Sequence, residues 1–329
     1  MRLVRSSTLR WSPALLLPAV GGCQAVRPVA GSATDTTTYC AAPRQLFARD
    51  TLLVASLGGA FQPPDTLALV GLSARSRQLV PYYGLAMGLH QLRQLRGAGL
   101  VAGGAGYPAF VRQRRLLVLA AEQANADVLR VAEELDCERQ RAEQAAVALA
   151  GVQAKRQNHF TVGSLLAGGA SGILGSTLQN DDLNLVLTLS TAVLSAALGV
   201  ATLLVNPQLA YPIRQNMLAD IWYQRRRSAL YPPGLWAALR EVRVGGAAAE
   251  LPPPLQTMRQ RWTQYDQFAS GKAAQQTQQQ TLYFGAGGNY HVDDLHTRAS
   301  MLAEVEGYVR LAGQDLQRLQ LEISQLEPW

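Results

Sequence analysis

Several residue types are scarce in this chain, and each shortage narrows what the protein can be. Aromatic side chains make up 7% of the 329 residues, so a β-rich fold is poorly supplied. Charged residues make up only 16%, and the mean hydropathy is +0.00, which favours a partly membrane-associated chain over a freely soluble enzyme. The three cysteines and four histidines show no CxxC or Cys/His spacing, so no zinc site is expected.

Lysine is nearly absent, since Lys155 and Lys272 are the only two among the 30 basic residues. The net charge is +7, and such a balance suits either nucleic acid or an anionic membrane surface. The arginines are scattered among acids and glutamines, with one dense cluster at residues 225–227. No basic stripe is interleaved with stacking aromatics, so we expect no nucleic-acid partner. The cluster itself is interpreted as a solvated helix face, with contact to anionic headgroups as the alternative.

The N-terminus has the order of a secretory signal. Arginines without any acid are followed by a short apolar stretch and then by small residues before Cys23. The ending Val20-Gly21-Gly22-Cys23 resembles a bacterial lipobox. This resemblance implies a signal peptide over residues 1–22 and lipidation of Cys23. Because Gln24 follows with no acid nearby, it also implies an outer-membrane lipoprotein facing the periplasm, with the inner membrane as the alternative.

The two other cysteines, Cys40 and Cys137, leave two possibilities open. In an oxidising compartment they can form one disulfide, which would tie the segment after the lipid anchor to a long helix. Otherwise they are two unrelated free thiols.

The remaining chain divides by composition. Residues 23–50 are rich in Thr, Ser, Ala, Pro and Gly and are expected to form a flexible tether. Residues 51–110 are interrupted by Gly and Pro and predict an irregular region with short helices, one of them starting just after Pro81. Residues 214–329 are expected to complete a helical bundle. A helix is predicted over residues 213–230, and a mobile glutamine-rich loop over residues 275–280.

Two segments carry apolar residues alternately three and four positions apart, which is typical of helices that pack along their length. The first covers residues 111–156, and the second starts near Asp293 or Asp294 and ends before Pro328. They predict an all-α fold, an elongated antiparallel helical bundle or coiled coil. The stripe residues are Leu117, Ala121, Ala124, Val128, Val131, Leu135, Ala142, Ala145, Leu149 and Val152, and then Leu302, Val305, Val309, Ala312, Leu316, Leu319, Ile323 and Leu326.

Between these helices, residues 157–213 predict a central Gly-rich apolar helical hairpin. Residues 161–178 and 185–205 are predominantly apolar, and about twenty such residues span a hydrocarbon core. A polar turn at Asp181 and Asp182 joins the two arms. The hairpin is either inserted in a membrane or buried as the core of a soluble bundle. The membrane-facing segment would include Leu185, Leu194, Leu198 and Val205.

The first arm is rich in glycine, and Gly168 and Gly172 have the GxxxG spacing. Glycines at such spacing let two helices pack closely in a membrane, so Gly163, Gly168, Gly172 and Gly175 are candidate hairpin-packing residues. In a soluble helix each would cost about 1 kcal/mol relative to Ala.

The charges around the hairpin conflict with the lipobox. Lys155, Arg156 and Arg214 flank the hairpin, and the positive-inside rule places such flanks in the cytoplasm. The conflict disappears if the signal is false, if the hairpin lies in another membrane, or if it stays sheltered until assembly. The last arrangement resembles α-helical pore-forming proteins in layout only.

One region near the C-terminus is a weak ligand candidate, formed by Gly285, Gly287, Gly288, His291 and His296. Glycines before a helix can cradle a phosphate, and histidines can ligate a metal. No Walker lysine follows, and the histidines are five residues apart and share a helix face poorly. A tight connection, helix capping and surface roles are therefore favoured, and we expect neither a metal nor a cofactor. No catalytic set of Ser, His and Asp stands out, so we do not expect an enzyme or a small-molecule substrate.

These features predict a lipid-anchored bacterial envelope protein with a membrane-inserting helical hairpin and a structural or pore-like assembly role. Its expected partners are membrane lipid and either further copies of itself or another protein. The alternative is a soluble periplasmic scaffold or adaptor that binds other proteins through its heptad faces, with the hairpin as buried core. An enzyme or ligand-binding module that uses residues 285–296 is the third hypothesis.

Overall fold

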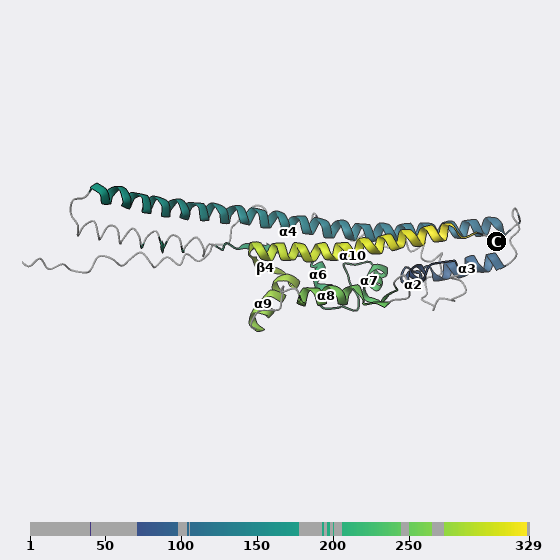
Figure 1. The fold of residues 1–329 in the computed structure, drawn as a ribbon. Helices are drawn as coiled ribbons and strands as arrows, with labels where there is room; N and C mark the ends of the chain where they lie inside the picture. The colour runs from purple at the N-terminus through teal and green to yellow at the C-terminus, as the bar shows by residue number, and fades with distance from the viewer. Residues whose placement is uncertain are drawn as a thin grey trace, which may run out of the picture.

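The structure is a computed structural model that describes residues 40, 71–97, 104, 106–177, 193, 196, 197, 200, 206–244, 250–264 and 273–327. Over these residues the chain is mostly helical, as the sequence predicted (Figure 1). Several predicted residues lie outside the described ranges. They are Cys23, the rest of the tether except Cys40, and the membrane-facing candidates Leu185, Leu194, Leu198 and Val205.

Two long helices, α4 (Tyr107–Thr177) and α10 (Val292–Ser324), pack side by side and run antiparallel (Figure 1). Three contacts set their alignment. Arg139 on α4 lies 3.5 Å from Glu306 on α10, Gln320 donates to Glu122 over 2.9 Å, and the Arg114 guanidinium donates to the Leu326 carbonyl over 3.0 Å. Most residues of the two predicted stripes are buried between these helices and their neighbours.

α4 is longer than the sequence analysis expected. It starts at Tyr107, where Pro108 is tolerated because the first turn of a helix has no hydrogen-bond partner for its N–H groups. It also continues without a break past residue 156, where the predicted hairpin was expected to begin as a separate segment. No proline occurs on α4 after Pro108, and a Cβ atom added at Gly151 would meet nothing within 4 Å. Neither a proline nor this glycine therefore ends the helix near residue 156.

The shorter elements lie below the α4–α10 pair in Figure 1. Their hydrophobic core includes Trp222, Trp262 and Phe284, with Trp222 and Phe284 stacked at 4.4 Å between ring centroids. The helices are α2 (Ala74–Tyr82), α3 (Ala86–Gly97), α6 (Met217–Trp222), α7 (Pro233–Arg240), α8 (Pro254–Gln264) and α9 (Ala273–Phe284). Of these, α2, α7 and α8 pack on α10, and α3 packs on α4.

Two small antiparallel sheets were not foreseen. β1 (Leu209–Pro212) pairs with β4 (Gly287–Tyr290), with Leu209 opposite Tyr290, and β2 (Arg243–Val244) pairs with β3 (Glu250–Leu251). The helix predicted over residues 213–230 was therefore wrong in extent, because only α6 forms there. The strand before α6 depends on a partner nearly eighty residues away, which local periodicity does not reveal.

Two further predictions were wrong for local reasons. The glutamine-rich residues 275–280 belong to helix α9 rather than to a loop, because glutamine and alanine are both good helix formers. Pro81 lies inside α2 near its end rather than before a new helix. The chain turns instead at Gly84, whose φ of +71° favours glycine, and α3 starts two residues later.

Candidate functional site

The most unusual feature of the described chain is the part of α4 that extends beyond α10. Arg139 is level with Glu306, and α10 starts fourteen residues before Glu306, so its start is level with about residue 153 of α4. The remaining 24 residues, 154–177, continue as helix for about 36 Å at 1.5 Å per residue. Figure 1 shows α4 continuing past the start of α10. We call this segment the α4 arm.

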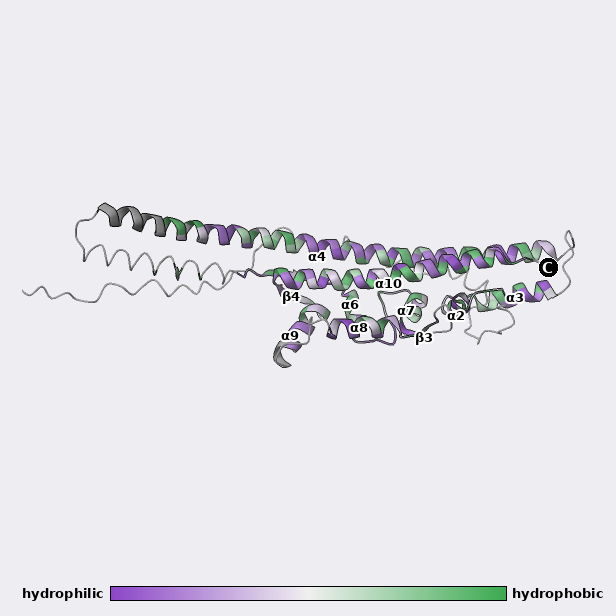
Figure 2. Ribbon diagram, viewed as in Figure 1, coloured by the Kyte–Doolittle hydropathy of each residue, from purple (hydrophilic) through white to green (hydrophobic). Residues whose placement is uncertain are grey.

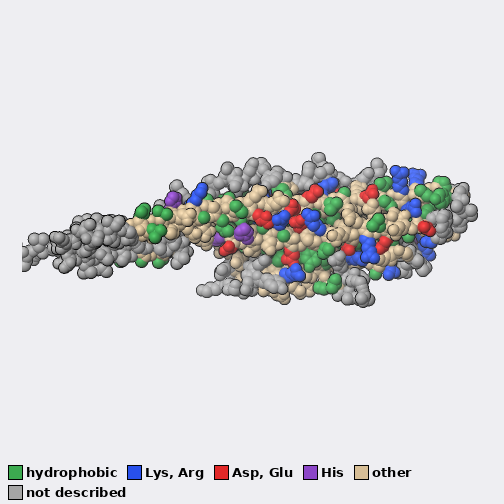
Figure 3. All heavy atoms as spheres, turned by 45° about the horizontal axis from the view of Figure 1, so that its top comes forward, with side chains coloured by type: hydrophobic (Ala, Val, Ile, Leu, Met, Phe, Trp, Pro, Cys, Tyr) green, Lys and Arg blue, Asp and Glu red, His purple; other side chains and the backbone are tan. Residues whose placement is uncertain are grey.

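The α4 arm exposes large apolar side chains. Val162 is 54% exposed, and Leu165 and Leu166 are each 69% exposed. Figure 2 shows hydrophobic residues on α4 past the start of α10, and Figure 3 shows hydrophobic side chains at the surface of this narrow part of the molecule. Val193 and Val200, which belong to the second predicted arm, are helical and also exposed. Contiguous apolar exposure of this kind marks surfaces that contact a membrane or another protein.

Basic residues lie at the base of the arm. Lys155 and Arg156 are exposed, and Arg214 is exposed just after β1. No acidic residue occurs on α4 after Glu143. The α4 arm therefore combines cations at its base with an apolar surface beyond them.

Within the described ranges, no helix reaches both the length and the mean hydropathy of a membrane span. The predicted packing glycines all lie on α4: Gly163, Gly168, Gly172 and Gly175. They were predicted to pack against the second helix of the hairpin, residues 185–205, most of which lies outside the described residues. Close packing at these glycines stays a prediction.

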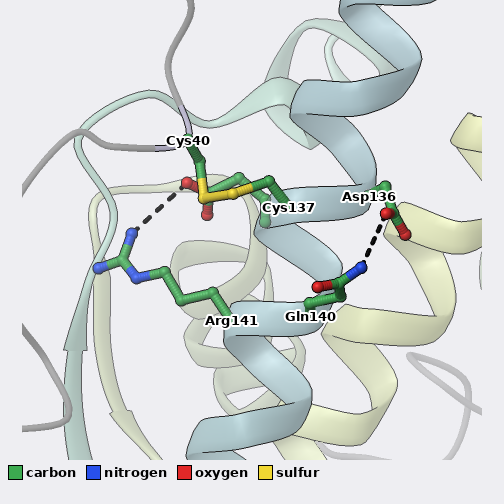
Figure 4. The surroundings of a disulfide bond; sticks show 6 residues. Cys40, Asp136, Cys137, Gln140 and Arg141 are labelled. Atoms are coloured by element: carbon green, nitrogen blue, oxygen red, sulfur yellow. Dashed lines mark hydrogen bonds and ion pairs between the residues drawn. A yellow bond between two sulfur atoms is a disulfide. The ribbon is translucent and has the colours of Figure 1, made fainter.

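A disulfide joins Cys40 to Cys137 in the middle of α4. The two Cα atoms are 5.5 Å apart, and Cys40 is buried. Figure 4 shows the bond beside Arg141 and Gln140, with the Gln140 amide donating to Asp136 over 2.8 Å. The Arg141 guanidinium lies 5.0 Å from the centroid of the Tyr211 ring. The bond thus ties the segment that follows the predicted lipid anchor to the central helix.

A buried acid lies one turn before the disulfide. Glu134 on α4 is 8% exposed. Burial, followed by the negative charge of Glu138, raises the pKa of the Glu134 carboxyl to about 7. The sequence analysis did not single out Glu134, because it lies next to the apolar stripe rather than on it. Tyr231, outside the α4–α10 pair, lies close enough to interact with the charge of Glu134.

The weak ligand candidates have structural roles. His291 is the N-cap of α10, and its ring nitrogens lie 2.9 Å from the Gln208 amide nitrogen and 3.3 Å from the Pro207 carbonyl. The Asp294 carboxylate accepts the His291 N–H over 3.0 Å, which completes a capping box. His296 is exposed further along α10, so the two histidines do not converge on one point.

The glycines of this region let β4 approach β1. Gly287 has a φ of +85°, and a Cβ there would lie 2.2 Å from the Tyr211 carbonyl oxygen. At Gly285, a Cβ would lie 2.4 Å from the Thr281 carbonyl oxygen. Gly288 lies in the same strand, opposite Tyr211. These residues therefore shape a tight connection between α9 and β4.

Among the described residues, metal-ligating side chains do not gather in one place. No group of three His, Cys, Asp or Glu side chains among them could hold a metal ion. A pocket lined by Arg75, Leu239, Tyr308 and Asp315 has a volume of about 10 Å³, which suits one water molecule. Because it exposes large apolar side chains, the α4 arm is the best candidate for a functional surface.

Comparison of the chain with protein-family models, with curated proteins and with solved structures gave no match.

Proposed function

We propose that this chain is a lipid-anchored envelope protein whose helical body presents an apolar hairpin for insertion into a membrane, in a structural or pore-like assembly. One observation carries the proposal: α4 extends about 36 Å beyond its partner helix and exposes Val162, Leu165 and Leu166. Transfer of such side chains from water to hydrocarbon is favourable by about 2 kcal/mol each.

Two other features support this assignment. The Cys40–Cys137 disulfide fits an oxidising compartment such as the periplasm, where the lipobox resemblance would place the chain. Lys155 and Arg156 at the base of the arm suit the headgroup level of a bilayer whose hydrocarbon core the arm enters.

The soluble scaffold is less well supported as an alternative. It requires free heptad faces, yet the stripe residues Leu135 and Leu149 on α4 and Val305 and Leu316 on α10 are buried. It also requires the hairpin to be core, whereas Val162, Leu165 and Leu166 of the arm are exposed. A partner protein would therefore have to bind the arm itself or another surface.

Flotation with liposomes tests the proposal. The protein is residues 23–329 with Cys23→Ser, so that no lipid can be attached, and the lipids are neutral phosphatidylcholine at high salt, which suppresses adsorption by charge alone. We expect the protein to float. Leu165→Glu should abolish flotation, because a carboxylate in the inserted arm is costly.

Leu321→Glu is the matched control. Leu321 is 61% exposed on α10 in the body, so the same substitution there should leave flotation unchanged. A folded wild-type protein that stays at the bottom of the gradient would exclude insertion by the arm.

A further inference from the structure

The loop between α6 and α7 presents a row of arginines. Arg225, Arg226 and Arg227 are all exposed there, rather than lying on the helix that the sequence predicted. α6 ends at Trp222, and the chain turns at Gln224, whose φ of +47° is rare for a residue other than glycine. We call residues 223–227 the arginine loop.

The backbone of the arginine loop is held from both neighbouring helices. The Trp236 indole N–H of α7 donates to the Arg225 carbonyl over 3.1 Å, and the Arg240 guanidinium donates to the Arg226 carbonyl over 2.8 Å. On the α6 side, the Arg225 N–H donates to the Asp220 carbonyl over 3.2 Å. A loop fixed at these points loses little further conformational entropy when its side chains bind a partner.

The charges of this loop are only partly neutralised. The buried Asp220 carboxylate pairs with Arg225 over 3.1 Å and also accepts the Ser228 hydroxyl. Within the described part of the chain, Arg226 and Arg227 form no ion pair. Arg259 is also exposed, and its guanidinium lies 5.3 Å from the centroid of the Trp222 ring. An unneutralised positive surface therefore surrounds the end of α6.

The α4–α10 pair shows the opposite arrangement. Figure 3 shows basic and acidic side chains interspersed over it. Arg139 contacts Asp136, Glu143 and Glu306, and Arg310 also contacts Glu306. The free positive charge of the arginine loop is thus a local property and does not simply follow from the net charge of the chain.

The geometry of the loop selects the kind of partner. The three arginines lie exposed on a turn, so they suit an extended anionic surface better than an enclosed small ligand. Guanidinium groups bind phosphate oxygens with paired hydrogen bonds. Tyr223 beside them is 55% exposed, and tyrosine favours the boundary between hydrocarbon and headgroups.

We propose that the arginine loop docks the protein on the phosphate headgroups of an anionic membrane. This docking requires no insertion of the α4 arm and goes beyond the function proposed above. Binding through the arginine loop should weaken as the salt concentration rises, because exposed charges are screened over about 10 Å at 0.1 M ionic strength. Insertion of the α4 arm should not weaken in this way.

The test compares vesicles of phosphatidylcholine alone with vesicles that contain about 30% phosphatidylglycerol, at low salt and with the Cys23→Ser protein. We expect clearly tighter binding to the anionic vesicles, and loss of this preference at high salt. Arg226→Gln with Arg227→Gln should weaken binding to the anionic vesicles by about 30-fold, a factor of about five for each arginine. Binding to neutral vesicles should not change, which separates this result from the insertion test.

Arg112→Gln with Arg115→Gln is the matched control, because both arginines are exposed at the start of α4 and the net charge changes equally. It should weaken binding less than about threefold. Equal losses in the two double variants would show attraction by net charge and would overturn the proposal. Displacement by inorganic phosphate, but not by chloride at equal ionic strength, would point to a small-anion site and would overturn it as well.

Discussion

α4 is one continuous helix in two different surroundings. Up to about residue 153 it packs against α10, buries its apolar stripe and carries ion pairs on its other faces, such as Arg130–Asp127 and Arg139–Glu143. Beyond that point the partner helix ends and acids no longer occur, while apolar side chains become exposed. Hydrophobic residues are common in both parts, so hydrophobic content alone does not separate them.

The comparison shows that the position of the partner helix determines the role of an apolar residue. Leu149 is buried because α10 reaches it, whereas Leu165, four turns later, has no such cover among the described elements. Glycines accumulate only in the arm, where packing against a closely approaching helix or lipid can offset their low helix propensity.

Removal of the disulfide should destabilise the body and spare the arm. The Cys40–Cys137 bond closes a loop with a sequence separation of 97, so Cys40→Ser with Cys137→Ser should lower the free energy of unfolding by about 4 kcal/mol. Urea denaturation of the oxidised wild type and the double variant measures this, with reduced wild type as the control. Flotation should be unchanged. A loss below about 1 kcal/mol would mean that the bond contributes little to the fold.

Truncation of one leucine in each part should give very different results. Leu135→Ala opens a cavity in the α4–α10 core and should cost about 3 kcal/mol, whereas Leu165→Ala should change the stability by less than about 0.5 kcal/mol. Thermal or urea unfolding without lipid is the measurement. Equal costs would mean that the arm is part of the cooperative core.

The smallest expected effect is a pH dependence confined to the body. Because the pKa of Glu134 is raised to about 7, the folded state keeps a proton that the unfolded state loses above its ordinary pKa. This carboxyl should therefore make the wild type less stable as pH rises from about 5 to 8, by about 2 kcal/mol, and should cause no further change above about pH 8.

Glu134→Gln isolates this contribution. The difference in free energy of unfolding between the wild type and Glu134→Gln should decrease from pH 5 to 7, while other titrating groups cancel. A difference that stays constant over this range would show that Glu134 is charged in the folded protein throughout.

Periodicity in the sequence was enough to locate the two long helices and to predict that they pack on each other. Leu117 to Leu149 and Leu302 to Ile323 form their stripes at helical spacing, and a stripe of that kind must be covered by another apolar surface. Local chemistry also predicted helix capping at the start of α10. The N-cap is His291, however, and not Asp293 or Asp294, near which the helix was expected to start.

Features that depend on contacts between residues distant in the chain could be found only in the tertiary structure. The point where α10 starts beside α4, and thus the length of the arm, depends on packing between segments separated by more than a hundred residues. β1 forms because β4 lies beside it, and the arginines at 225–227 leave the helix because α6 and α7 hold the intervening turn. Periodicity reveals which face of a helix is apolar, but only the folded chain determines whether another segment covers that face.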